Sequence, residues 1–412
     1  MPPFPFRNIE FFALLAPALM LILATKRLGV AAFTWTIVVV SAVFFAWLPG
    51  LHLFYAALCL GLIVMIWGAA NLLKQRRVSS VLLLSIAILA SAFAVVRLHA
   101  AGLLPNAYRP GGLLPAFGFA FFVIKAYGLL IDTASGRVKS AALRDVLAYF
   151  AYFPTVIAGP VFRFDDFVKQ LSTAVADHQG AARITGNVPR LLAGAFKVMV
   201  VAGLLEPWSI QSLTPDVLAN SAPRVYAGAL AYYFFEYINF SGYTDMAAAV
   251  SRMIGLATPE NFDLPFLSRN LTELWRRWHM SFASWLRDYV YFPLHFQLSK
   301  RAGATTRRLQ TLCAAAAIFL TFVFCGAWHG LALGTLLFGV LSGIVLAVEA
   351  LAAGLGWKTG AGARLQATPA GRVTHDTIRQ IWTLHVASAT FAPVLLTREQ
   401  LMAVYHLLRT IV

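Results

Sequence analysis

Charged residues are scarce in this 412-residue chain: Lys, Arg, Asp and Glu make up 12% of it, against 59% hydrophobic residues. A soluble domain of this length could not hide so much apolar surface, because even large domains leave much of their surface in water. A spanning helix needs about 20 apolar residues, and a β-barrel would show short alternating segments. The apolar segments here are long and uniform. We therefore expect an all-α polytopic membrane protein.

Cysteine is also rare, and several catalytic motifs are missing. The three cysteines, Cys59, Cys313 and Cys325, show no CxxC spacing, which argues against a disulfide framework and a zinc site. HExxH, GxSxG and carboxylate clusters with ligand spacing are absent. We expect no metal and no tightly bound cofactor. Internal repeats and long linkers are absent too, so the sequence predicts a single domain over 1–412.

Acidic residues are half as frequent as basic ones, 17 against 33, which gives a net charge of +16. The basic residues gather between apolar segments, as the positive-inside rule predicts, so we expect a lipid membrane and no nucleic acid as partner. The rule places loops 74–77 and 137–144 in the cytoplasm and the N-terminus outside. The first apolar run lacks a basic n-region and a cleavage site and is interpreted as a retained helix.

The apolar segments predict the membrane spans. They lie near 10–25, 29–48, 51–73, 79–100, 113–132, 190–206, 224–255, 309–325, 328–353 and 381–397. A further apolar segment, 146–162, is interrupted by Pro154, Gly159 and Pro160. Broken helices are tolerated at membrane depth where protein or water covers the freed backbone groups, so we do not expect an ordinary lipid-facing span there.

Segment 268–293 combines aromatic and basic residues. Treated as one helix at 100° per residue, it carries an apolar stripe with His279 at its edge and arginines beside it. The stripe consists of Trp275, Trp278, Phe282, Trp285 and Tyr289, and the arginines beside it are Arg276 and Arg287, whereas Arg277 lies on the opposite face. This pattern fits a protein-lined funnel, or a structural helix at the membrane interface with snorkelling arginines.

A second histidine, His329, stands at the head of an apolar span, in the segment 324–330. It is either a structural histidine or a titratable group near pH 7 in a dry site, as acid–base catalysis requires. Cys325 precedes it by four residues. If the helix continues through Gly326, the two share a face, which permits a Cys–His nucleophile pair; the alternative is a small buried thiol.

Four segments together resemble the membrane-bound O-acyltransferase family. They are FPTVIAGPVFRF (153–164), YFFEYINFSGYTDMA (233–247), TPENFDLPFLSRNLTELWRRWHMSFASWLRDYVYF (258–292) and FCGAWHG (324–330). Their order and the 50 residues between His279 and His329 carry the resemblance. It implies a ring of about ten to eleven helices, some re-entrant or interfacial, around a central funnel or tunnel.

The resemblance also implies roles for individual residues. His329 would be the general base that deprotonates the acceptor hydroxyl, and His279 would orient the acceptor or donate to the oxyanion. The tryptophans would exclude water. The expected substrate-contacting residues are Trp275, Trp278, Arg276, Arg277, Trp328, Ser241, Tyr243 and Asp245.

The donor implied by the resemblance is an acyl thioester on phosphopantetheine, presented by an acyl carrier protein or as acyl-coenzyme A. The acceptor is a hydroxyl of an extracytoplasmic envelope polymer or lipid-linked acceptor, and an extracytoplasmic acyl-relay or acceptor-handling protein is the expected partner. The chain itself is expected to be a multi-pass protein of the cell's inner (cytoplasmic) membrane. The compact FPLHFQLSKRAG stretch (292–303) resembles the D-alanyl branch, whereas WRRWHMSFASWLRDYVYFPL (275–294) resembles the acetyl branch. We expect D-alanyl transfer, with O-acetyl transfer as the alternative. A transporter and a non-catalytic scaffold are rival classes.

Overall fold

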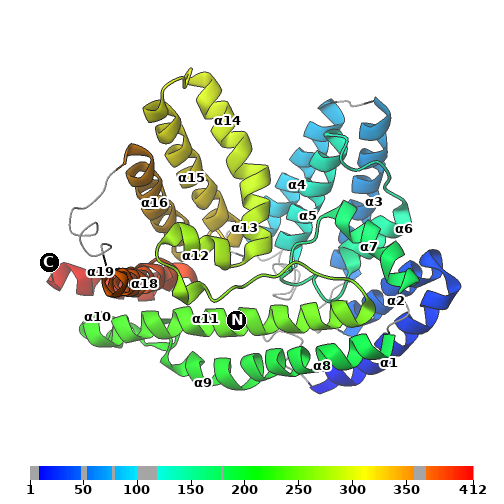
Figure 1. The fold of residues 1–412 in the computed structure, drawn as a ribbon, viewed down its shortest axis with the longest axis horizontal. Coiled ribbons are helices and arrows are strands. Elements are labelled where there is room, and N and C mark those ends of the chain that lie inside the picture. The colour runs from blue at the N-terminus through cyan, green and yellow to red at the C-terminus, as the bar shows by residue number, and fades with distance from the viewer. Residues whose placement is uncertain are drawn as a thin grey trace. The chain divides into compact units, whose positions relative to one another are not determined.

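The structure is a computed structural model that describes residues 9–47, 53–76, 79–100, 118–177, 180–356 and 368–411. Every regular element in these ranges is a helix (Figure 1). The chain divides into two compact units, one of residues 1–199 and 242–260 and the other of 200–241 and 261–412. The single domain stays a prediction, and the two units are described separately.

The first unit begins with four long apolar helices and a shorter fifth. These are α1 (Ile9–Thr25), α2 (Val30–Trp47), α3 (Leu53–Arg76), α4 (Ser79–Ala100) and α5 (Phe119–Ala134), with the short η2 (Lys26–Leu28) after α1. Helix α1 packs on α2, and α3 packs on α4 and α5, which lie side by side in Figure 1. The first four predicted spans are confirmed within a few residues.

The interrupted segment 146–162 does not form a span, as predicted. Helix α6 (Leu143–Ala151) ends before a series of turns, and α7 (Phe164–Ala176) begins after them. The Tyr243 hydroxyl donates to the Pro154 carbonyl at 3.2 Å and accepts from the Ala158 amide at 3.2 Å. These bonds satisfy backbone groups that the broken helix leaves open, which is why the break is tolerated.

The first unit also contains α8 (Gly180–Phe196), the π-helical η5 (Lys197–Val201) as far as Met199, and the end of α11 (Ala222–Ile254). Helices α8 and α11 approach closely at two glycines, since a Cβ on Gly194 would lie 2.6 Å from the Gly242 carbonyl oxygen. Beside this contact, Arg190 bonds to Asp245 at 2.8 Å, and Lys197 bonds to the same carboxylate at 2.7 Å.

The second unit holds the remaining helices. They are α9 (Ala202–Leu205), η6 (Glu206–Trp208), η7 (Ile210–Ser212), α10 (Pro215–Asn220), the start of α11, η8 (Pro265–Leu267), α12 (Leu271–Arg277), α13 (Met280–Leu286), η9 (Arg287–Tyr291), α14 (Phe292–Arg301), α15 (Arg307–His329), α16 (Leu333–Leu355), α18 (Pro369–Phe391), η10 (Ala392–Leu395) and α19 (Arg398–Ile411). Helix α15 packs against both α14 and α16 (Figure 1). Helix α19 packs on α10, where Gln400 donates to the carbonyls of Gln211 and Leu213.

Seven segments among the described residues are long and apolar enough to cross a membrane. They are Glu10–Leu28, Val30–Trp47, Ala57–Lys74, Ser79–Leu98, Gly180–Trp208, Arg307–His329 and Leu333–Leu355. The all-α, polytopic prediction is therefore confirmed. The spans expected at 224–255 and 381–397 are helical, but these helices are not among the seven. Residues 77 and 113–117, part of a predicted loop and span, lie outside the described residues. The sidedness and the ring around a funnel stay predictions.

Candidate functional site

The helix expected over 268–293 is broken, so that prediction is wrong. Helix α12 ends at Arg277 and α13 begins at Met280, with Trp278 and His279 between them. His279 adopts left-handed backbone angles, φ +45° and ψ +47°, which a residue with a side chain seldom takes. A single 100° wheel therefore does not describe the segment.

The break is fixed by hydrogen bonds to the preceding segment, residues 261–263. The Met280 amide donates to the Asn261 carbonyl at 2.9 Å, and the Asp263 amide donates to the Arg277 carbonyl at 3.0 Å. The Asn261 side-chain oxygen accepts from the Ser281 amide at 3.2 Å. These bonds occupy backbone groups that a continuous helix would have used internally.

The start of α12 is capped from two sides. The side-chain oxygen of Asn270 accepts a hydrogen bond from the Glu273 amide at 2.7 Å. The carboxylate of Glu349, on α16, accepts the amides of Leu271 at 2.9 Å and Thr272 at 3.0 Å. A negative charge at a helix N-terminus is favourable, because the first amides lack partners within the helix. Glu349 thereby ties the short α12 to a long apolar helix.

The two histidines come together around one phenylalanine. The ring of Phe282 lies 5.0 Å from that of His279 and 6.3 Å from that of His329, centroid to centroid. His279 is 4% exposed, and its ring stands at 90° to Phe240. His329 is the last residue of α15, and its side chain is exposed. His279 lies outside the seven apolar segments. Burial lowers the pKa of its imidazole well below the usual value, and the nearby His329 lowers it further.

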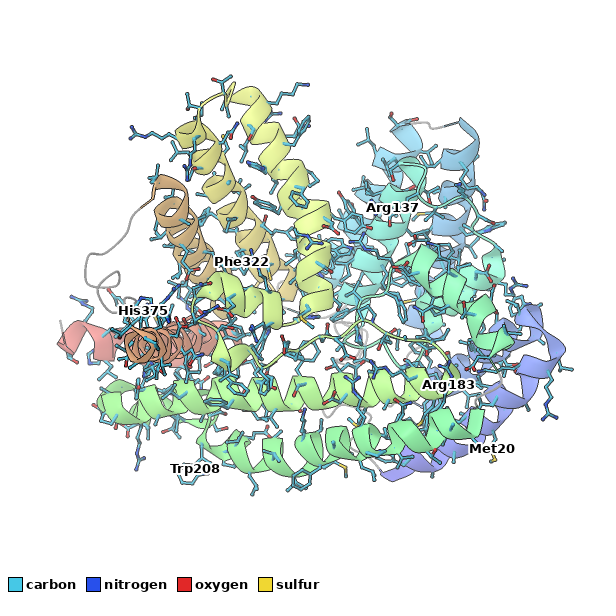
Figure 2. The ribbon with its side chains drawn as sticks, in the orientation of Figure 1. Met20, Arg137, Arg183, Trp208, Phe322 and His375 are labelled. Atoms are coloured by element: carbon cyan, nitrogen blue, oxygen red, sulfur yellow. The ribbon has the colours of Figure 1, made fainter. Side chains whose placement is uncertain are left out.

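The three tryptophans form part of the same aromatic cluster. Trp328 stacks on Phe282 at 4.3 Å. Trp278 and Trp275 both contact Phe391 on α18, at 4.9 Å and 5.7 Å. Trp275 also meets Phe322, which is labelled in Figure 2, at 4.9 Å. The rings predicted to exclude water are brought together with the histidines; that they line a tunnel stays a prediction.

The two arginines of α12 differ in their surroundings. Arg277 bonds to Glu273 at 3.2 Å and approaches Asp263 at 3.5 Å. Arg276 is exposed and has no ion pair with any residue that the structure describes. Arg276, three residues before His279 in the chain, is therefore available to a ligand or partner.

Ser241, Tyr243 and Asp245 divide between the two units. Ser241 is the last residue of its segment in the second unit, whereas Tyr243 and Asp245 belong to the first unit. Within the first unit, Tyr243 contacts the 154–158 turn, and Asp245 pairs with Arg190 and Lys197. These contacts are structural; the substrate-binding role predicted for the three residues stays a prediction.

Cys325 lies one turn before His329, because α15 runs without interruption through Gly326. The thiol is completely buried, at 0% exposure, as expected for a small core side chain. A Cβ on Gly326 would lie 2.6 Å from the carbonyl oxygen of Thr335 on α16, so the glycine allows α15 and α16 to touch.

Sequence reasoning missed Asn261 and Glu349. Glu349 could have been noticed, since a single carboxylate in an otherwise apolar span is costly unless it has a partner. Asn261 lies in the quoted Pro-Glu-Asn-Phe stretch, but nothing in its spacing relates it to His279. The described residues contain no group of three or more His, Cys, Asp or Glu placed to hold a metal ion.

Comparison with known proteins identifies the family. A model described as the membrane-bound O-acyltransferase family matches residues 47–378. The chain is 35% identical over 243 residues to the probable alginate O-acetylase AlgI of Azotobacter vinelandii, covering 58% of this chain and 44% of that protein. It is 28% identical over 240 residues to the teichoic acid D-alanyltransferase of Bacillus subtilis, covering 58% of this chain and 60% of that protein. It is 27% identical over 221 residues to the peptidoglycan O-acetyltransferase of Helicobacter pylori, covering 54% of this chain and 40% of that protein. The matches thus span about half the length of these relatives.

Proposed function

Because this chain belongs to the membrane-bound O-acyltransferase family, we propose that it moves an acyl group from a thioester to a hydroxyl, with His329 as the general base. The observation that carries this proposal is the pairing of an exposed histidine at the end of an apolar helix with a buried histidine across one phenylalanine ring. A base must be reachable by the acceptor, and only His329 of the two is exposed.

The reaction balances without a metal or a redox step. His329 takes the proton of the acceptor hydroxyl as the oxygen attacks the thioester carbonyl. The carbon–sulfur bond then breaks, and the proton passes to the departing thiolate. The aromatic cluster of Trp275, Trp278 and Trp328 would keep water, the competing nucleophile, away from the thioester.

The donor is an acyl thioester on phosphopantetheine, brought by an acyl carrier protein or as acyl-coenzyme A. Both carry negative charge, and the exposed Arg276, which has no ion pair among the described residues and precedes His279 by three positions, supports their approach. Arg276→Glu should raise the KM for the donor and make it more sensitive to salt. Arg301→Glu, on the exposed end of α14, is the matched control and should change neither value. Equal effects from both variants would place donor docking elsewhere.

The acceptor is a hydroxyl of an extracytoplasmic envelope polymer or lipid-linked intermediate, reached in the cytoplasmic membrane with the help of an acceptor-handling protein. D-alanyl is the acyl group we propose first, since the match covers 60% of the D-alanyltransferase and only 44% of the alginate O-acetylase. O-acetyl transfer is the second candidate, because the identity to the alginate O-acetylase is higher, 35% against 28%.

Mass spectrometry of envelope polymers identifies the acyl group. It compares the ester content of a deletion strain with that of the same strain complemented with the wild type or with His329→Ala. Loss of an alanyl ester, restored only by the wild type, supports D-alanyl transfer. Loss of an acetyl ester supports the second candidate. An unchanged ester content in the deletion strain would contradict the proposed function.

A further inference from the structure

Asn261 is bonded to each of the three residues at the start of α13. Its backbone carbonyl accepts the Met280 amide at 2.9 Å. Its side-chain Oδ1 accepts the amide of Ser281 at 3.2 Å and the hydroxyl of Ser281 at 2.6 Å. The same Oδ1 lies 3.4 Å from Nδ1 of His279. Asn261 is 2% exposed, so these contacts are made away from bulk water.

The contact with Ser281 determines which way the Asn261 amide points. The oxygen and nitrogen of an asparagine side chain look alike, and their assignment follows from their hydrogen-bond partners. A backbone N–H can only donate, so the Asn261 atom that faces the Ser281 amide is the oxygen. A rotated side chain would place an NH₂ group against that N–H.

This orientation determines the tautomer of His279. An amide oxygen has no proton to give, so the His279 nitrogen facing it, Nδ1, is the one that donates. A neutral imidazole carries a single ring proton, and Nε2 is then the acceptor. The ordinary state of His279 is neutral, because the ring is buried and lies near His329, the titratable group that faces it. Arg277, on the preceding turn, is paired with Glu273 and Asp263.

We propose that Asn261 is a positioning residue that holds the His279 ring in its Nδ1-protonated tautomer and presents Nε2 as a hydrogen-bond acceptor. The role of this tautomer in acyl transfer rests on the proposed function. Of the two roles that the family resemblance implies for His279, an Nε2 acceptor can orient the hydroxyl of the incoming acceptor. It cannot donate to the oxyanion, so the oxyanion's donor lies elsewhere.

The backbone gives Asn261 a second effect on the same ring. His279 occupies left-handed backbone angles, and the residues after it are held by Asn261 through the Met280 and Ser281 amides. The direction in which the imidazole leaves the chain depends on that turn. Asn261 therefore controls both the place of the ring and the place of its proton.

The test uses full-length protein in detergent with ¹⁵N-labelled histidine, and His279→Gln identifies the His279 signals. We expect a protonated, pyrrole-type Nδ1 and an unprotonated, pyridine-type Nε2 at neutral pH. The reverse pattern, or rapid exchange between both tautomers, would overturn the proposal. Because no acyl transfer is measured, failure of the proposed function would leave this result unchanged.

Asn261→Asp keeps an acceptor oxygen toward Ser281 and supplies a second measurement. A carboxylate beside Nδ1 should raise the pKa of His279, followed by the same ¹⁵N signals, by about one unit or more. Asn270→Asp, the same substitution at the N-cap of α12, should leave the His279 titration unchanged, since aspartate caps as well as asparagine. A His279 titration that is equal in both variants would show that Asn261 does not contact the ring and would refute the proposal.

Discussion

The contact between α15 and α16 allows a quantitative prediction. Alanine at position 326 would place its Cβ 2.6 Å from the Thr335 carbonyl oxygen and 2.9 Å from the Gly339 Cα. Ordinary contacts between nonbonded atoms are about 3.5 Å or longer. Both neighbours are backbone atoms of α16, so a side-chain rotation cannot relieve the overlap. The two helices must separate.

Forcing an extra methyl group into a packed interface costs about 1–3 kcal/mol. Alanine is better than glycine in a helix by about 0.5–1 kcal/mol, which offsets part of that cost. Gly326→Ala should therefore destabilise the protein by roughly 1–2 kcal/mol, or about 5- to 30-fold in the unfolding equilibrium. Activity should fall as well, because His329 lies three residues further along α15.

The assay is thermal unfolding in detergent, with acyl transfer measured on the same samples. Gly68→Ala in α3 is the matched control, since a Cβ there meets nothing within 4 Å. We expect its Tm to stay the same or to rise slightly. If Gly326→Ala has the same Tm as the Gly68→Ala control and keeps full activity, the close approach of α15 and α16 is not present in the protein.

Two further outcomes follow from other parts of the structure. Cys325→Ser should keep near-full acyl transfer if His329 acts without a nucleophilic thiol; a folded but inactive variant would instead support an acyl-cysteine intermediate. Glu260, which lies outside the apolar spans, has its pKa lowered, chiefly by its hydrogen bond from Arg190. The stability it adds is present above its unfolded pKa of about 4.3 and is lost as pH falls through the folded value. Glu260→Gln should lower Tm slightly at pH 7 and flatten the decline of Tm below about pH 4; an unaltered decline would contradict this.

The long spans could be predicted from sequence because a single property, apolar length, determines them. Helices α2 and α4 begin and end within a few residues of the predicted bounds. The polar helices were harder to interpret. Segment 224–255 is helical as expected, yet its polar residues divide between two units, and Tyr243 serves the turn at 154–158.

The break at His279 could not be predicted from periodicity, because residues 271–286 are compatible with a helix throughout. What ends α12 and starts α13 is a segment ten to twenty residues earlier, through Asn261 and Asp263. Glu349 acts on α12 from 77 or 78 residues away. Such pairings depend on tertiary contacts, and one sequence carries no local trace of them.

The central claim is that His329 is the base of an acyl transfer. The most direct measurement compares wild type with His329→Ala in proteoliposomes, using a donor thioester and an acceptor polymer identified from the envelope analysis. The account predicts that the variant inserts and melts like the wild type but transfers at least about 100-fold more slowly, since loss of a general base costs about 10²–10⁴ in rate. A folded His329→Ala protein that retains more than about a tenth of the wild-type rate would contradict the claim.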